Sequence, residues 1–90
     1  MCRNIRVLHN FEPPTTPEEM RAAAVQYVRK VSGMVKPPQA DRAAFERAID
    51  EVTASTERLL AVLSSRGAVR TREGEREKAR ARWERRPEPL

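Results

Sequence analysis

The strongest constraint on this chain is a stop signal that separates two helical patterns. Gly33 suits the left-handed end of a helix, and Pro37-Pro38 prevents that helix from continuing. On both sides, mostly apolar residues recur at alternating spacings of four and three, which is the period of one helix face. They are Met20, Ala24, Tyr27 and Val31 before the stop, and Phe45, Ile49, Val52, Thr56, Leu59 and Leu63 after it. The pattern predicts an all-α fold, a helical hairpin with helices at 17–32 and 41–66.

The predicted helix ends carry local signals. Thr16 is placed to cap the first helix, Pro17 suits its first position, and Glu19 completes a capping box. Asp41 is placed to cap the second helix, and Gly67 is its expected stop. We expect Met20, Tyr27 and Phe45, which lie on the apolar stripes, to pack in the core.

The two predicted helices differ in length. At 1.5 Å per residue they span about 24 Å and about 39 Å, so the second overhangs the first by about 15 Å. Its apolar end, with Leu59, Leu60 and Leu63, needs another cover. A homodimer through this helix is the simplest solution. The rival is a monomer in which Ile5, Val7 and Phe11 of the N-terminal segment lie over the end.

The first eleven residues alternate loosely, with Ile5 and Val7 on one side and Arg6 and Leu8 on the other. This alternation predicts a short extended N-terminal arm. Because a lone strand is not stable by itself, the arm must lie on the helices or pair with a second copy.

The positive charge of the chain is concentrated in its tail. Residues 1–65 hold 9 basic and 8 acidic residues, or +1, whereas residues 66–90 hold 9 basic and 5 acidic residues, or +4. The tail is rich in helix formers but poor in apolar residues, so we expect a charged, weakly packed helix at about 71–86, with Gly74 weakening its first turn. We divide the chain into a helical domain with its arm at 1–67 and a basic helical tail at 68–90.

The tail is the best candidate for binding a partner. Arg76 and Arg80 share one helix face, and Trp83 suits a protein groove or a nucleic-acid base. Phosphate contacts are open to nine basic residues: Arg66, Arg70, Arg72, Arg76, Lys78, Arg80, Arg82, Arg85 and Arg86. Interleaved glutamates repel phosphate and pair with these cations, which favours protein docking or a solvated helix over nucleic acid.

Few residues here are typical of catalysis. With Met1 removed, Cys2 would carry a free amine beside its thiol, so thiol or metal chemistry stays open beside simple packing. His9 lies too far along an extended arm to share a site with Cys2. No catalytic triad, phosphate-binding glycine loop or metal motif occurs. We expect a cytoplasmic protein without enzymatic activity, cofactor, metal site or membrane span.

Several segments together resemble a family of small bacterial proteins, domain of unknown function 2277. They are Met1-Cys2-Arg3-Asn4-Ile5, Asn10-Phe11-Glu12-Pro13-Pro14, residues 23–33, Lys36-Pro37, residues 44–48, Arg58-Leu59-Leu60 and residues 78–82. The chain departs from the pattern at Met34 and Val35 and at Gly74. The resemblance implies a bacterial, cytoplasmic protein and brings no activity, substrate or catalytic residue.

We therefore predict a non-enzymatic accessory or regulatory protein that binds a protein partner or larger complex. Nucleic-acid or ribosome association through the tail is the alternative, and chemistry at Cys2 is a third. The candidate partner-binding residues are Cys2, Arg3, Asn4, Gln26, Arg29, Lys30, Arg76, Arg80 and Trp83.

Overall fold

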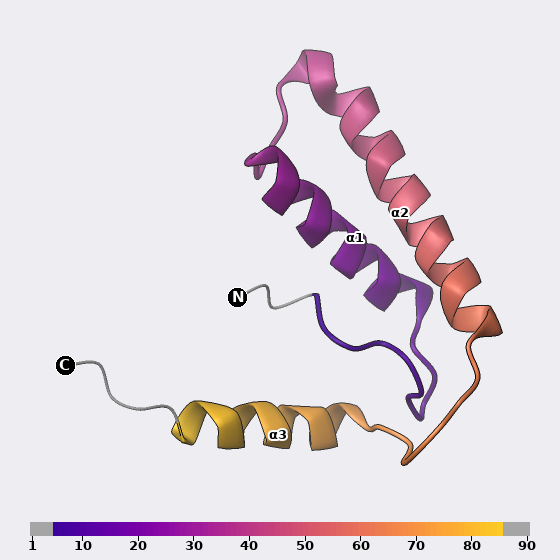
Figure 1. The fold of residues 1–90 in the computed structure, drawn as a ribbon. Helices are drawn as coiled ribbons and strands as arrows, with labels where there is room; N and C mark the ends of the chain where they lie inside the picture. The colour runs from indigo at the N-terminus through magenta and orange to yellow at the C-terminus, as the bar shows by residue number, and fades with distance from the viewer. Residues whose placement is uncertain (1–4, 86–90) are drawn as a thin grey trace.

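A computed structural model describes residues 5–85 of the chain. Within this range the secondary structure consists of three α-helices and one short 3-10 helix, and no strand is formed. Figure 1 shows α1 (Pro17–Ser32) and α2 (Arg42–Val62) side by side as a hairpin, with α3 (Arg72–Glu84) diverging from the end opposite the hairpin loop. The predicted all-α hairpin is confirmed.

The first helix has the predicted range and the predicted ends. Thr16 Oγ1 accepts a hydrogen bond from the Glu19 N–H at 3.2 Å, and the Glu19 carboxylate accepts one from the Thr16 N–H at 2.8 Å. Together they form the capping box. Gly33 is left-handed, with φ 72°, and donates its N–H to the Arg29 carbonyl at 2.9 Å. Local signals were sufficient here because every partner lies within four residues.

The second helix ends before the predicted limit of residue 66. Asp41 occupies the predicted N-cap position but gives no side-chain cap, and the prediction of Gly67 as the stop is wrong. Asp41 ends the 3-10 helix η1 (Gln39–Asp41), and its carboxylate makes no capping hydrogen bond. Its backbone, with φ −101° and ψ −2°, is not the extended one of most N-cap residues. At the other end Leu63 is already extended, so α2 stops at Val62, and Gly67, with φ 76°, lies in the following linker.

The early end of α2 allows the linker to pair with the N-terminal segment. Phe11 and Arg70 form an isolated parallel bridge, in which the Glu12 N–H donates to the Arg70 carbonyl at 2.9 Å. The Arg70 N–H donates in turn to the Asn10 carbonyl at 2.8 Å. The extended arm thus finds its backbone partner within the same chain, which is the tertiary contact that overrides the helical pattern of residues 63–66.

The core of the hairpin is small. Only Ala24, Val28 and Ile49 are buried among the described residues, with Val25 and Phe45 among the half-buried side chains packed against them. The expectation that Tyr27 belongs to the core is wrong, since 48% of it is exposed. Ala24 and Val28 take the centre because a single helix neighbour covers only a narrow stripe of α1. The other two expected core residues, Met20 and Phe45, are half-buried.

The apolar end of α2 is partly covered by the N-terminal segment. Leu8 and Phe11 line a hollow together with Leu60 and Leu63. The monomer alternative predicted that Ile5, Val7 and Phe11 would cover this end. Phe11 does so, but Leu8 takes the place of Ile5 and Val7, which stay exposed. Leu63 remains 44% exposed, which leaves apolar surface that a second copy could cover. The homodimer therefore stays a prediction.

The third helix begins with an N-cap residue, Thr71, whose side chain is hydrogen-bonded to the backbone of Gly74. Thr71 Oγ1 accepts a hydrogen bond from the Gly74 N–H at 2.9 Å. A Cβ on Gly74 would lie 2.8 Å from that oxygen, so the glycine makes room for the cap. The predicted range of about 71–86 is close to the observed Arg72–Glu84.

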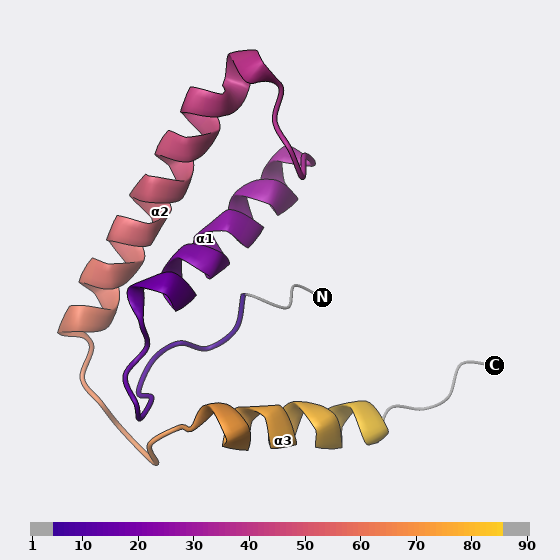
Figure 2. The same ribbon diagram turned by 180° about the vertical axis from the view of Figure 1, so that it is seen from behind.

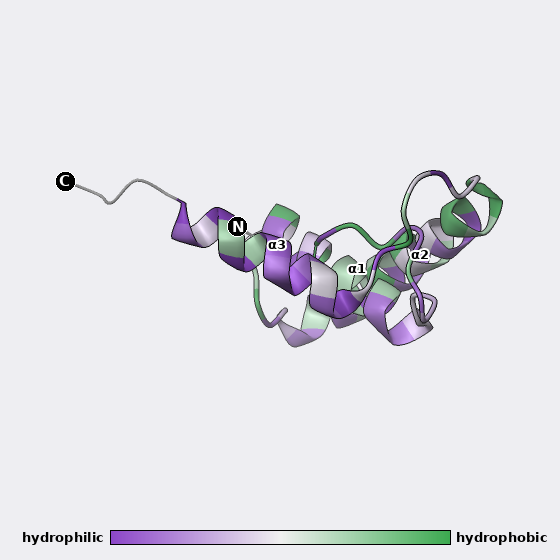
Figure 3. Cartoon of the chain, turned by 90° about the horizontal axis from the view of Figure 1, so that it is seen from below, coloured by the Kyte–Doolittle hydropathy of each residue, from purple (hydrophilic) through white to green (hydrophobic). Residues whose placement is uncertain are grey.

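The molecule is flat. Its principal extents are 44 × 44 × 15 Å, and the view from below in Figure 3 shows it nearly edge-on, with α3 mostly hydrophilic. Figure 1 and Figure 2 show, from opposite sides, α3 standing apart from the hairpin and residues 5–16 running between them. Over the described range, no helix has both the length and the apolar character needed to cross a lipid bilayer.

Candidate functional site

The bend of the N-terminal segment is fixed by Asn10. This residue has a left-handed backbone, with φ 63°, which asparagine tolerates better than most residues. Its side-chain amide donates to the carbonyls of Arg66 at 3.3 Å and Ala68 at 3.2 Å. One asparagine therefore joins the bend in the arm to the linker that follows α2.

Two arginines complete the attachment, Arg70 from the linker and Arg72 from the start of α3. Arg70 Nη1 donates to the His9 carbonyl at 2.8 Å. Arg72 binds the Glu19 carboxylate through two bonds, Nε to Oε2 at 2.7 Å and Nη2 to Oε1 at 2.6 Å. Such paired bonds match the planar guanidinium to the carboxylate and are stronger than single neutral ones.

Arg72 also holds the segment before α1. Its Nη1 donates to the Pro13 carbonyl at 2.8 Å and its Nη2 to the Pro14 carbonyl at 3.1 Å. Its guanidinium carbon lies 5.4 Å from the centre of the Phe11 ring, within the range of a cation–π contact. We call Asn10, Glu19, Arg70 and Arg72 the clamp.

Glu19 has two roles in this clamp. Its Oε1 accepts both the Thr16 N–H of the capping box and the Arg72 guanidinium. The hydrogen bonds from Arg72 first, and from the Thr16 backbone second, lower the pKa of Glu19 from 4.5 to about 2. The start of α1 and the start of α3 are thus joined through one carboxylate that stays ionised.

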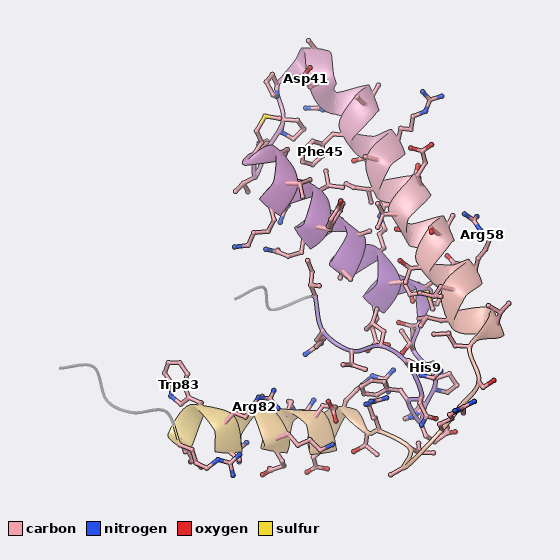
Figure 4. The ribbon with its side chains drawn as sticks, in the orientation of Figure 1. His9, Asp41, Phe45, Arg58, Arg82 and Trp83 are labelled. Atoms are coloured by element: carbon pink, nitrogen blue, oxygen red, sulfur yellow. The ribbon has the colours of Figure 1, made fainter. Side chains whose placement is uncertain are left out.

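A hollow of about 480 Å³ lies beside the clamp, between the N-terminal segment and the end of α2. Figure 4 shows His9 at this junction. His9, Glu12 and Glu57 line it together with apolar side chains such as Leu60. No three histidine, cysteine, aspartate or glutamate residues of the described range are grouped to hold a metal ion. The hollow can admit a side chain or small molecule with one polar and one apolar end.

The predicted partner-binding residues do not form one surface. Cys2, Arg3 and Asn4 lie outside the described residues, so chemistry at Cys2 stays a prediction. On α1, Gln26 is half-buried and Arg29 and Lys30 are exposed.

On α3, Arg76, Arg80 and Trp83 are exposed, and Figure 4 shows Trp83 pointing from the helix toward the side of the hairpin. Arg80 pairs with Glu77 at 3.3 Å. Arg76 lines a small hollow with Arg6 and Val7 of the N-terminal segment, so the structure brings the arm and α3 together there.

Arg70 and Arg72 have a different role from the one expected of them. Both were candidates for phosphate contacts, but their guanidinium groups hold the N-terminal segment and Glu19. Arg72 and Glu19 are 53 residues apart, and no spacing rule connects residues at that distance. Asn10, in the Asn-Phe-Glu-Pro-Pro segment, was the one available signal for a bend.

A family model described as "Uncharacterized conserved protein (DUF2277)" matches residues 1–78. The chain belongs to the DUF2277 family. The match to DUF2277 spans all four clamp residues and ends within α3, so the resemblance seen in the sequence is confirmed over that range. No curated protein and no solved structure matches the chain.

Proposed function

We propose that this DUF2277 protein is a non-enzymatic accessory protein that binds a protein partner by presenting α3 beside its N-terminal segment. The observation that carries the proposal is the way α3 is held. Its first residue is fixed by the clamp, while within the described chain the helix packs against no other helix. A helix that is fixed at its origin and packs against no other described helix is suited to dock against another molecule.

The energetics of α3 support the same conclusion. Its 13 residues span about 20 Å, and helices of this length are marginal in water without tertiary packing. The ion pairs Glu75–Lys78, at 3.2 Å, and Glu77–Arg80, at 3.3 Å, each add only a few tenths of a kcal/mol. Docking on a partner would supply the packing that the helix lacks.

The charge of α3 favours a protein partner over nucleic acid. The helix carries five basic and four acidic residues. One of the five, Arg72, is committed to Glu19, so the remaining charges balance. A neutral face with alternating signs suits a protein surface better than a phosphate backbone. A cytoplasmic location is part of the proposal, since a single cysteine leaves no internal disulfide to hold a secreted fold of this size.

The test is affinity purification from the native cell with the full chain, with a chain ending before α3, and with Arg72→Ala. We expect a protein captured by the full chain to be lost without α3 and reduced by Arg72→Ala. Arg58→Ala, on the outer side of α2 in Figure 4, is the control and should capture as wild type does.

Nuclease treatment separates the two candidate functions. If capture disappears with nuclease, the nucleic-acid alternative holds instead. If the same protein is captured equally well without α3, presentation of this helix is not the function.

A further inference from the structure

A second surface lies at the loop end of the hairpin, away from α3. There a groove of about 280 Å³ opens between the end of α1 and the start of α2. Its floor is apolar, made by Val25, Pro37, Phe45 and Ile49, with the exposed Val35 at its side. Figure 4 shows Phe45 pointing from α2 into the space between the two helices.

Three cations from three elements line this groove. Arg29 comes from the last turn of α1, Lys36 from the loop, and Arg42 is the first residue of α2. All three are exposed, and none has a side-chain hydrogen bond or ion pair with another described residue. They leave a local charge of +3 around an apolar floor.

The acidic residue that also lines the groove is already paired. Glu46 binds Arg21 Nη2 at 2.9 Å, and Asp50 binds Arg21 Nη1 at 2.8 Å. Arg21, the fourth basic residue of the lining, is neutralised by these two carboxylates. The other three cations therefore have no counter-charge within the groove.

The helix dipoles favour the position of one of these cations but disfavour the position of another. Arg29 lies at the negative end of α1, where a cation is favourable. Arg42 lies at the positive end of α2, whose first turn contains no acidic residue, and a cation there is unfavourable. A residue that breaks a local rule without a compensating contact is a candidate for function.

We propose that this groove binds an acidic segment of a protein partner, with carboxylates on Arg29, Lys36 and Arg42 and a large apolar side chain over Phe45 and Val35. Charge complementarity identifies the class of occupant, and the apolar floor favours a peptide over a nucleic acid. The site is separate from α3 and does not depend on the function proposed for that helix.

The experiment titrates the full chain with a fluorescent peptide of four glutamates around one phenylalanine. We expect saturable binding, with backbone amide shifts in the NMR spectrum centred on Val35 and Phe45. A peptide with lysines in place of the glutamates should not bind. An oligothymidylate of matched charge is the second probe.

Variants locate the binding. Arg29→Gln with Lys36→Gln and Arg42→Gln should weaken the peptide at least about tenfold, because three charge-assisted contacts are lost. The control removes the same charge elsewhere, through Lys30→Gln, Arg47→Gln and Arg58→Gln, and should stay within about twofold. Because all six substituted positions are exposed, we expect both triple variants to have the helicity of wild type by circular dichroism.

Three results would overturn the proposal. They are no peptide binding up to about 1 mM, equal loss in both triple variants, or tighter binding of the oligothymidylate than of the peptide. The amide shifts on the wild-type chain locate the site even if a triple variant fails to fold. Shifts confined to α3 would assign the peptide to that helix and also overturn the proposal.

Discussion

At the scale of single residues, Arg72 joins three parts of the chain. Its guanidinium binds Glu19 in α1, the carbonyls of Pro13 and Pro14, and the face of Phe11. Because its own backbone begins α3, this side chain attaches the start of that helix to α1 and to the N-terminal segment. The sequence marked this residue only as one of nine candidates for phosphate contacts, and its structural role comes from contacts that the sequence does not mark.

The lowered pKa of Glu19 predicts a pH dependence of stability. The pKa is about 2 in the folded chain against an ordinary 4.5, so its stabilising contribution is complete above about pH 4.5 and lost as the pH falls toward about 2. Urea unfolding of wild type and Glu19→Gln between pH 6 and pH 2 measures it. The difference in unfolding free energy should shrink across this range, and a constant difference would contradict the role of the charge.

The contact of Gly74 with the Thr71 cap predicts that Gly74→Ala will not give the usual gain in helix stability. Glycine to alanine within a helix normally stabilises it by about 1 kcal/mol. Here the new Cβ would lie 2.8 Å from Thr71 Oγ1 and displace the cap, which costs about 1 kcal/mol. We expect Gly74→Ala to leave the amide protection of α3 nearly unchanged in wild type and to raise it in a Thr71→Ala background. Equal gains in both backgrounds would show that the cap tolerates the methyl group.

At the scale of elements, the hairpin and α3 are stabilised in different ways. α1 and α2 share a narrow buried stripe and the Arg21 ion pairs, whereas α3 depends on its cap and the clamp. Helices gain most of their stability in proteins from packing an apolar face. The hairpin is therefore the part of the chain in which core substitutions should matter.

Two valines provide a matched test of this difference. Val28 is 5% exposed in the core, and Val62 is 79% exposed at the end of α2. Val28→Ala should lower the free energy of unfolding by about 2 kcal/mol, because buried methyl groups are lost and a cavity remains. Val62→Ala should change it by less than about 0.5 kcal/mol. Chemical denaturation measures both, and similar values would contradict the assigned core.

At the scale of the whole molecule, the shape is unusually open. The radius of gyration is 15.8 Å, whereas a compact domain of 90 residues has about 12 Å. Large apolar side chains stay exposed on each of the three α-helices, including Tyr27, Leu59 and Trp83. A flat chain with such a small core presents much surface for binding, which agrees with a partner-dependent role.

Solution scattering tests the arrangement of α3. The wild-type monomer should give a radius of gyration near 16 Å, and Arg72→Ala should increase it because α3 is no longer held at its origin. Arg82→Ala, an exposed position on the same helix, is the control and should match wild type. An unchanged profile for Arg72→Ala would mean that the backbone bridge at Phe11 and Arg70 suffices. Light scattering in the same samples decides the predicted homodimer, which would give about twice 10.3 kDa.

The sequence by itself determined the helical hairpin and the full extent of α1. Those features depend on apolar periodicity and on caps whose partners lie within four residues, such as Thr16 with Glu19. Of the clamp residues, the sequence predicted only the capping role of Glu19. Asn10 was not a predicted site residue, and the clamp arginines were candidates for phosphate contacts.

Only the tertiary structure decided where α2 ends, what the N-terminal segment pairs with, and what Arg70 and Arg72 bind. Their contacts join residues 53 to 61 positions apart. Local periodicity contains no information about such pairs, because the path of the whole intervening chain decides whether the two residues meet. The same reason explains Tyr27, whose exposure depends on how many neighbours α1 finds rather than on its place in the helical pattern.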